Sequence, residues 1–465
     1  WEHSVLTGSS PIINGNVKLT IPINKQGYYK VFIKIFKDNI LIKEKETRAA
    51  ILSKFDFSQV DAQTSPFSIQ THLAWTGKGW VAEDILPLIN KMGAKSIRDA
   101  IVWEEVETSP GVYNFGIDRN KYPKSINLAK KNGLDVLISF GSVNKLYDQN
   151  STPYDDEGRT AMAAYATATT KKFALQITNF GGYNEFSGGF GDRGKGPADS
   201  KPSYYLPLQQ KIYTAVKAVN PILMINGGET AGKGDIAWLE ELFKINNAEA
   251  LNYMDRLSVH PYRNELSVET LNDYVPKLNT MVSKYNNGKT KPLWFTEIGR
   301  WVGYTPTART TEIKQASELV KTYVLALANG VERINWYEFM NSGTSRESVQ
   351  HNFGVTFTKN DVLGSNVPKP AYVSYAVMTR NLTGFKFFKR ITEVNEDTYH
   401  YVFSKTNNQI QVLWAAKGNP TISLKTQNPI LIKDLFGDVE EIKPIAGIIK
   451  LKLSYYPVYI LAKDI

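Results

Sequence analysis

Two glutamates stand at the ends of short apolar runs in this chain of 465 residues. Glu185 follows Gly182-Tyr-Asn184, and Glu297 follows Trp294-Phe-Thr. A carboxylate among apolar residues is costly unless it is paired or used. Two facing carboxylates can cleave a glycosidic bond, because one protonates the leaving oxygen while the other attacks the anomeric carbon. A separation of about 5 to 5.5 Å would retain the anomeric configuration, and a wider gap would invert it. The alternative is that each glutamate only pairs with a neighbouring Lys or Arg.

Four polar residues near other apolar runs suit supporting roles at such a site: Arg98, Asn184, His260 and Tyr262. Arg98 would bind a sugar hydroxyl or orient a carboxylate through a charge-assisted contact. Asn184 could hold the sugar 2-hydroxyl, a contact that strengthens in the transition state. Tyr262 could place its hydroxyl against Glu297 while His260 lies near Glu185, which would give the two carboxyl groups unequal surroundings. A core-capping histidine and a packed tyrosine are the alternatives.

Aromatic residues near the ends of the same runs could line a cleft for sugars. Trp336 and Trp301 are candidates for stacking platforms, and His72 and Trp103 are candidates for the cleft wall. Flat apolar sugar faces stack on such rings. Core or rim packing explains each of the four equally well.

Other kinds of catalytic site lack their motifs in this sequence. With no cysteine, a thiolate metal site or a cysteine nucleophile is impossible. The five histidines are scattered without a His-x-x-x-His pair, so we predict neither a metal nor a cofactor. A Gly-x-Ser-x-Gly nucleophile motif is absent as well. The Gly-rich run at 187–197 lacks the Gly-Lys-Ser/Thr ending of a phosphate loop and is better interpreted as a loop that shapes the cleft.

Short apolar runs alternate with longer helical patterns from about residue 66 onward, as βα units do. Eight runs are strand candidates: Phe67–Trp75, Ala94–Ala100, Leu134–Phe140, Gln176–Tyr183, Ile222–Asn226, Arg256–His260, Leu293–Glu297 and Arg333–Glu338. Gly93, Gly133 and Gly330 stand where helices need a left-handed cap before the next strand. The pattern predicts an α/β fold, a (β/α)8 TIM barrel, whose function gathers at the carboxyl ends of its strands. A doubly wound open sheet is the alternative.

Period-two patterns on both sides of the barrel predict β-sandwich-like modules. Residues 1–60 form the N-terminal β-module, with strand-like runs and a turn at Lys37-Asp-Asn, and this module could bind carbohydrate or continue upstream of Trp1. Residues 61–382 hold the catalytic barrel, and residues 383–465 form a C-terminal β-sheet or sandwich.

Composition limits the partners and the cellular location that we expect. The apolar fraction of 42% supports a large core, and a net charge of +10 favours an anionic substrate such as an acidic polysaccharide. The basic residues accompany no nucleic-acid-binding motif, so we expect no nucleic-acid partner. No apolar run is long enough for a transmembrane segment. The chain starts at Trp1 rather than Met, which a cleaved secretory signal or truncation would produce. We expect a monomer that is secreted, periplasmic or on the cell surface.

Two stretches resemble a known group of enzymes. Asn184-Glu185 and Glu297 look like the acid/base and nucleophile motifs of clan A retaining glycosidases. The stretch Ser96-Ile-Arg98-Asp-Ala-Ile-Val-Trp103, followed by Pro110-Gly-Val-Tyr-Asn-Phe115, resembles the strand-2 region of glycoside hydrolase family 39. That family includes β-xylosidases, α-L-iduronidases and bacterial exopolysaccharide hydrolases. The resemblance spans roughly residues 60 to 345 and implies retention, with Glu185 as acid/base and Glu297 as nucleophile.

One departure bears on substrate fit. Many clan members have Trp-Asn-Glu-Pro where this chain has Tyr183-Asn184-Glu185-Phe186. The Asn-Glu pair is kept, so the expected chemistry stands, whereas the flanking shape differs.

The leading hypothesis is therefore a retaining hydrolase that cleaves a bacterial exopolysaccharide or capsule-type glycan, in endo fashion. An exo-acting β-xylosidase or an α-L-iduronidase-like enzyme is the alternative within the same class. A non-catalytic carbohydrate-binding barrel is a second alternative, although it would not need both glutamates. A structural or adhesive surface protein would need neither.

Overall fold

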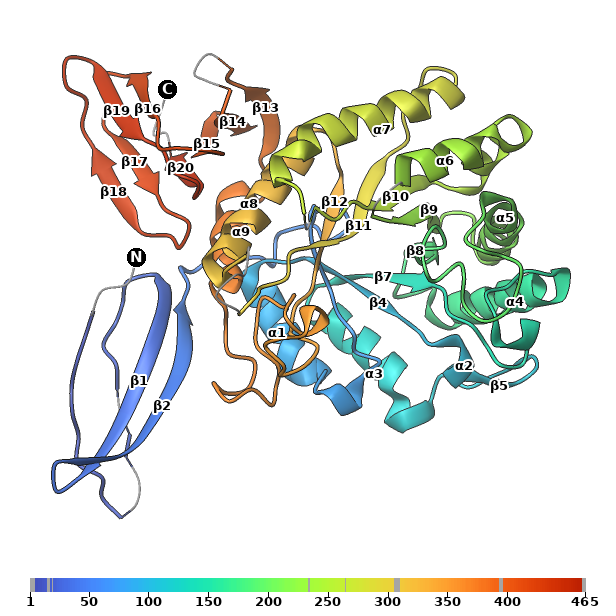
Figure 1. Cartoon of the computed structure of the whole chain (residues 1–465), viewed down its shortest axis with the longest axis horizontal. Coiled ribbons are helices and arrows are strands. Elements are labelled where there is room, and N and C mark those ends of the chain that lie inside the picture. The colour runs from blue at the N-terminus through green and yellow to red at the C-terminus, as the bar shows by residue number, and fades with distance from the viewer. Residues whose placement is uncertain are drawn as a thin grey trace.

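The computed structural model describes residues 5–14, 17–18, 20–232, 235–263, 265–304, 310–392 and 396–461. Its centre is a closed barrel of parallel strands, in the neighbour order β10-β11-β12-β3-β4-β7-β8-β9 (Figure 1). The strands are β3 Phe67–Gln70, β4 Ser96–Ala100, β7 Asp135–Phe140, β8 Asn179–Tyr183, β9 Met224–Ala231, β10 Arg256–His260, β11 Leu293–Gly299 and β12 Arg333–Tyr337. Each lies in or overlaps one of the eight runs expected from the sequence, which confirms the (β/α)8 barrel and excludes the doubly wound sheet.

A ring of helices covers the outside of the barrel (Figure 1). The ring consists of α1 Ala82–Met92, α3 Ile117–Lys131, α4 Asp156–Phe173, α5 Pro202–Val219, α6 Asp235–Lys244, α7 Leu271–Tyr285, α8 Glu312–Ala328 and α9 Pro370–Leu382. The predicted glycine stops are confirmed, since Gly93, Gly133 and Gly330 have φ of 91°, 69° and 82°. None of the helices described is both long and apolar enough to serve as a membrane crossing.

Several strands begin or end away from the predicted positions. The run Gln176–Tyr183 becomes strand only at Asn179, because the amides of Gln176 and Ile177 still bond to Phe173 at the end of α4. In the opposite direction, β9 extends five residues beyond the predicted end at Asn226, to Ala231. The added residues begin with Gly227 and Gly228, which look like a turn in sequence but here continue the strand.

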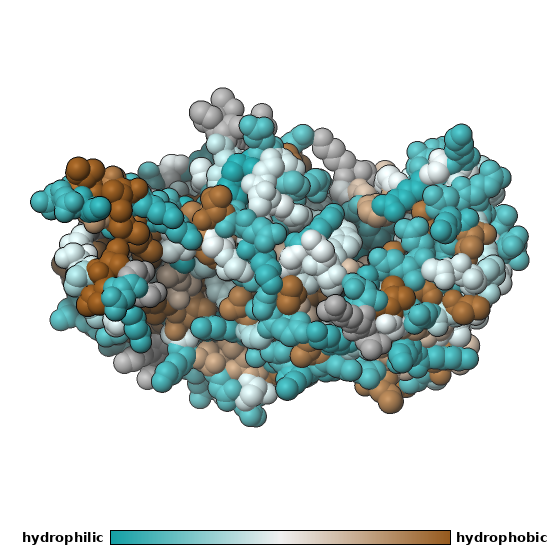
Figure 2. Space-filling model, turned by 90° about the horizontal axis from the view of Figure 1, so that it is seen from below, coloured by the Kyte–Doolittle hydropathy of each residue, from teal (hydrophilic) through white to brown (hydrophobic). Residues whose placement is uncertain are grey.

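The N-terminal region differs from the predicted sandwich. It contains one antiparallel pair, β1 Gly27–Lys37 and β2 Ile40–Ile51, and residues 17–18 and 20–23 form no strand. Asp38 and Asn39 have φ of 50° and 64°, so the predicted turn is a tight hairpin connection. Strand β2 is continuous from Ile40 to Ile51 because no glycine or proline interrupts it. Four large apolar side chains of the hairpin are exposed: Phe32, Phe36, Ile40 and Ile42. Figure 2 shows hydrophobic colour gathered at this end of the molecule.

The C-terminal region is antiparallel, as expected. A six-stranded sheet contains β13 Lys386–Arg390, β14 Thr398–Lys405, β15 Asn408–Ala415, β20 Val458–Leu461, β17 Ile430–Lys433 and β18 Val439–Ile442. A second pair comprises β16 Thr421–Lys425 and β19 Ile448–Lys452. Trp414 of β15 joins this region to the barrel, because its Nε1 donates to Glu269, which is also bound by Lys321 of α8.

Candidate active site

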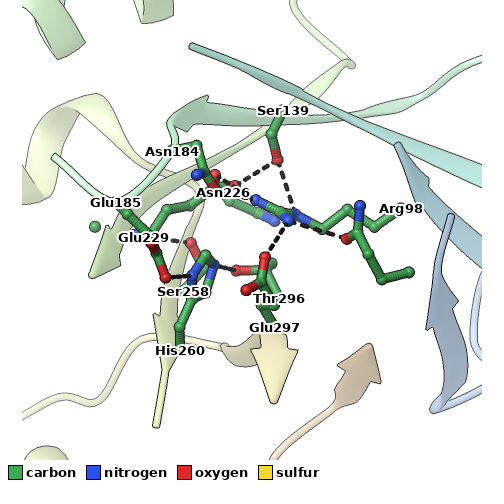
Figure 3. Close-up of polar contacts among 12 residues, drawn as sticks. Arg98, Ser139, Asn184, Glu185, Asn226, Glu229, Ser258, His260, Thr296 and Glu297 are labelled. Carbon is green, nitrogen blue, oxygen red and sulfur yellow. Dashed lines mark hydrogen bonds and ion pairs between the residues drawn. The ribbon is translucent and has the colours of Figure 1, made fainter. Parts of the chain in front are cut away.

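Glu185 and Glu297 lie at the carboxyl ends of β8 and β11 and face each other (Figure 3). One oxygen of each carboxyl and one ring nitrogen of His260 all lie within 4.8 Å of one another. The glutamate side chains keep 19% and 15% of their surface exposed, so both can meet a substrate from the barrel mouth. Sequence position alone placed the two residues on suitable strands, and the fold brings their carboxyl groups into one site.

Glu297 is surrounded by hydrogen-bond donors. Arg98 Nη1 donates to Oε2 at 3.0 Å, and the Tyr262 hydroxyl donates to Oε1 at 2.7 Å. Burial, together with the negative charge of Glu297, raises the pKa of Tyr262 well above its usual value, so this hydroxyl keeps its proton. Both carboxyl oxygens of Glu297 therefore accept hydrogen bonds, which hold the carboxyl group in one orientation.

Glu185 has surroundings of the opposite kind. Its Oε1 lies 2.8 Å from Nδ1 of His260, whose Nε2 lies 3.0 Å from the Thr296 hydroxyl. Burial lowers the pKa of His260 to about 4, so the ring is neutral at neutral pH. Burial also raises the pKa of Glu185, against the opposing charge of Arg98. The two carboxyl groups therefore have unequal surroundings, as separate acid and nucleophile roles require.

Arg98 connects the two halves of the site. Its guanidinium is 4% exposed and carries five N–H donors. The donors reach five different side chains: Gln70, Ser139, Asn184, Glu229 and Glu297. A buried cation with every donor satisfied is held in one orientation, so Arg98 fixes the positions of the groups around it.

The predicted cluster is thus assembled from six side chains on four strands or strand ends: Arg98, Asn184, Glu185, His260, Tyr262 and Glu297. His72 lies further out, with Nε2 3.3 Å from Glu338 and its ring 5.7 Å from that of Tyr337. Trp301 is half-buried after β11, and its role in stacking stays a prediction.

Two predicted cleft residues are misplaced. Trp336 is 1% exposed and packs in the hydrophobic core, because side chains alternate along a barrel strand. Arg333 of the same strand bonds to Asp135 across the barrel, so residues 333, 335 and 337 face inward and Trp336 faces the helices. Trp103 is also 1% exposed, and it stacks between Tyr147 and Tyr165. Neither tryptophan can stack on a substrate.

Three residues near the site were missed. Tyr337 lies 6.5 Å from Tyr262 between ring centroids, and the inward register of β12 would have identified it. Trp75 stacks on His72 at 4.1 Å and is 38% exposed, so it offers an aromatic surface to solvent. Glu229, a third carboxylate, could not be recognised from the sequence, because Gly227-Gly228 is typical of the end of a strand.

The three side chains Glu185, His260 and Glu297 are also the group, among the residues described, that could hold a metal ion. The histidine already contacts Glu185, and both oxygens of Glu297 already accept hydrogen bonds. Glu185 Oε1, the ring nitrogens of His260 and both oxygens of Glu297 therefore already have partners within the site.

Comparisons with known proteins agree with this geometry. The family model for the glycosyl hydrolase catalytic core matches residues 193–361, a segment that includes His260 and Glu297. A family 39 glycoside hydrolase from Bacteroides cellulosilyticus is similar in structure, with a TM-score of 0.79 and 22% identity over 94% of this chain and 88% of that one.

Two further structures share the fold at lower similarity. A family 30 endoxylanase from Clostridium papyrosolvens has a TM-score of 0.56 and 15% identity, covering 87% of this chain and 98% of that one. A monomeric β-xylosidase from Caulobacter crescentus has a TM-score of 0.56 and 13% identity, covering 86% and 96%. No curated protein matches the sequence at a significant level. By its match to the glycosyl hydrolase catalytic core, the chain is a glycoside hydrolase, and the solved structures show that its barrel fold is shared.

Proposed function

We propose that this glycoside hydrolase retains anomeric configuration, with Glu297 as nucleophile and Glu185 as acid/base. The observation that carries the proposal is the approach of the two carboxyl groups, whose nearest atoms lie within 4.8 Å. Retaining enzymes hold their carboxyl groups about 5 to 5.5 Å apart, whereas inverting enzymes leave about 6.5 to 9.5 Å for a water molecule.

The proposed reaction is a double displacement. In the first step a Glu297 oxygen bonds to the anomeric carbon, the glycosidic bond breaks, and its oxygen takes the proton of Glu185. In the second step a water oxygen bonds to the anomeric carbon, Glu185 takes the water proton, and Glu297 leaves as a carboxylate. Both residues return to their starting states.

Neighbouring groups support these steps. Tyr262 and Arg98 hold the Glu297 carboxyl group in position before attack. The neutral ring of His260 does not compete as an acid, so the proton of Glu185 remains available to the leaving group. Asn184 lies between the catalytic pair and Arg98, a position that suits contact with the sugar 2-hydroxyl.

The roles of the glutamates can be tested with aryl glycosides. Glu297→Gln is expected to lower turnover by at least about 10⁴-fold, because nucleophile and leaving carboxylate are lost together. In Glu185→Ala, azide should restore turnover of an activated substrate and yield a glycosyl azide of retained configuration. Glu107→Gln, which removes a buried carboxylate outside the site, serves as the control. Wild-type turnover in Glu297→Gln, or an inverted first product by proton NMR, would reject the proposal.

We further propose that the substrate is a bacterial exopolysaccharide or capsule-type glycan, attacked internally by a monomer that is secreted, periplasmic or on the cell surface. Support comes from the net charge of +10 and from Trp75, a partly exposed ring stacked on His72, which a sugar unit would reach by displacing the Lys78 side chain. Two of the similar structures are an endoxylanase and a β-xylosidase, so xylan-type glycans are the first neutral substrates to test.

Product length separates internal cleavage from the exo-acting alternative. A mixture of oligosaccharides early in a polysaccharide digest is expected from the wild type, and Trp75→Ala should shift activity toward short aryl glycosides. Activity on an acidic glycan should fall as ionic strength rises, because salt screens exposed charges. Monosaccharide as the sole early product would favour a β-xylosidase or iduronidase-like enzyme instead.

A further inference from the structure

Glu229 is inserted into the catalytic cluster by an irregularity of strand β9. Ser258 of β10 pairs with Gly228, whereas Val259 pairs with Thr230, so Glu229 is the extra residue of a β-bulge. Its φ of 42° lies in the left-handed region, which non-glycine residues seldom occupy. Gly228, with φ of 92°, allows the bulge, because a Cβ there would stand 2.7 Å from the Ser258 carbonyl oxygen. A bulge at the barrel mouth re-aims one side chain.

The backbone at the bulge is anchored to the acid/base residue. The amide of Glu185 donates to the carbonyl of Glu229 at 2.8 Å. The amide of Glu229 in turn lies 3.2 Å from the Ser258 hydroxyl, to which it donates. The strained conformation is thus held from both sides.

The Glu229 side chain is fully buried and reaches Arg98. Arg98 Nη2 donates to Oε2 at 3.2 Å, and the Ser139 hydroxyl donates to Oε1 at 3.0 Å (Figure 3). That hydroxyl also accepts from Arg98 Nε, so its own proton is directed to Glu229. Both carboxyl oxygens therefore accept hydrogen bonds, an arrangement that fits the ionised form.

We infer that Glu229 is a positioning residue, the permanent counter-ion of Arg98 through the double displacement. This inference rests on the proposed function. Arg98 pairs with two carboxylates, Glu297 on one side and Glu229 on the other. Once Glu297 becomes an ester, only Glu229 remains paired with the guanidinium.

The charge balance shows what this pairing does. Before attack, the cation of Arg98 lies between two carboxylates. When Glu297 bonds to the anomeric carbon it loses its charge, while Glu185 gives up its proton and becomes charged. Of the two carboxylates paired with Arg98, only Glu229 then stays charged, and a buried guanidinium without a paired carboxylate would disfavour that step. Glu229 shares the cation from the start, so Glu297 is less stabilised as a free carboxylate and attacks more readily.

Burial and the neighbouring polar groups act on Glu229 in opposite directions. Burial raises the pKa of Glu229, and the charge of Arg98, the His260 ring and the Ser139 hydrogen bond oppose the rise. The Tyr205 hydroxyl of α5 also faces this region and accepts a hydrogen bond from the amide of Gly228. Burial raises the pKa of Tyr205, so its hydroxyl stays neutral. Arg98 is the cation in contact with the carboxyl group.

The variant Glu229→Gln tests the inference, because it keeps the shape and removes the charge. Without Glu229, Arg98 stabilises the Glu297 carboxylate more strongly. We expect kcat/KM for 4-nitrophenyl glycosides that the wild type hydrolyses to fall about tenfold, and both limbs of its pH profile to move to lower pH by about one unit. Breakdown of the glycosyl-enzyme should become faster, since Glu297 is then the leaving group. With 2,4-dinitrophenyl glycosides, kcat should therefore hold or rise.

Controls separate this role from a structural one. Glu229→Asp retains the charge and should keep the wild-type pH profile, whereas Glu107→Gln removes a buried carboxylate elsewhere and should not shift it. A loss of activity in Glu229→Gln with an unchanged pH profile, or with slower glycosyl-enzyme breakdown, would overturn the inference.

One measurement needs neither turnover nor a folded variant. In the wild type, carbon-13 NMR of the glutamate carboxyl groups should show Glu229 ionised at neutral pH, and a protonated Glu229 would overturn the inference. This result does not depend on the roles of the catalytic pair, which Glu297→Gln tests separately.

Discussion

At the scale of single residues, the site depends on two carboxyl groups that differ in their burial and in their partners. Glu185 lies against a neutral histidine, and Glu297 lies against a guanidinium and a hydroxyl. The sequence was sufficient to identify both glutamates and their main partners, because each ends an apolar run beside other polar residues. It could not supply the protonation states, which arise from burial and from contacts between residues far apart in the chain.

The buried His260 makes stability depend on pH. Its pKa is about 4 in the folded protein, below its ordinary value of 6.5, so the unfolded chain takes up a proton that the folded chain refuses. Its contribution to stability is complete above pH 6.5 and is lost as pH falls toward 4. The loss is on the order of 2 to 3 kcal/mol.

Urea unfolding between pH 7 and 4 measures this effect. In His260→Gln, whose amide does not titrate, the free energy of unfolding should fall less steeply over the same range. Equal slopes for the wild type and the variant would show that His260 takes up no extra proton on unfolding.

At the scale of elements, the strand order and the caps were predictable, whereas registers were not. Alternation of apolar and turn residues located eight strands and their helices. It failed for Trp336, because a shift of one residue exchanges the inside and outside of a barrel strand. It also failed for Glu229, because a bulge depends on which strand lies alongside. Both failures concern pairing between strands, which a single run of residues does not encode.

The helix caps make a prediction at this scale. Gly93 and Gly330 both have positive φ, but a Cβ on Gly93 would meet Thr379 Oγ1 at 2.4 Å, and one on Gly330 would meet nothing within 4 Å. Gly330→Ala should cost about 1 kcal/mol from backbone strain alone, and Gly93→Ala about 2 to 4 kcal/mol because the clash adds to it. Chemical denaturation of both variants gives the comparison. Equal losses would mean that α9 shifts freely away from α1.

At the scale of the whole molecule, the C-terminal region contacts a buried ion pair of the barrel. Lys321 Nζ lies 3.0 Å from Glu269 and 3.3 Å from the centre of the Tyr455 ring, and Trp414 donates to the same carboxylate. Burial lowers the pKa of Lys321 to about 8, while Glu269 opposes the shift. The contact holds only while both parts are folded, so we expect them to unfold together.

Breaking the pair should be more harmful than replacing it. Lys321→Met leaves a buried carboxylate without its cation and should cost about 3 to 5 kcal/mol. The double variant Lys321→Met with Glu269→Gln should recover most of that loss. Trp414 fluorescence and far-ultraviolet circular dichroism should give the same midpoint in the wild type. Separate midpoints would show two independent units.

The bulge of β9 has a consequence for comparing this chain with its relatives. Glu229 reaches the site because β9 has one residue more than the paired stretch of β10. The bulge therefore depends on the number of residues between Asn226 and Ala231. A relative with a deletion there would present no third carboxylate, whichever residue an alignment set against Glu229. A relative of equal length with glutamine at that place would keep the bulge and lack only the charge. Counting residues in this segment, before comparing residue types, would therefore sort such enzymes by how they balance the charge of their arginine.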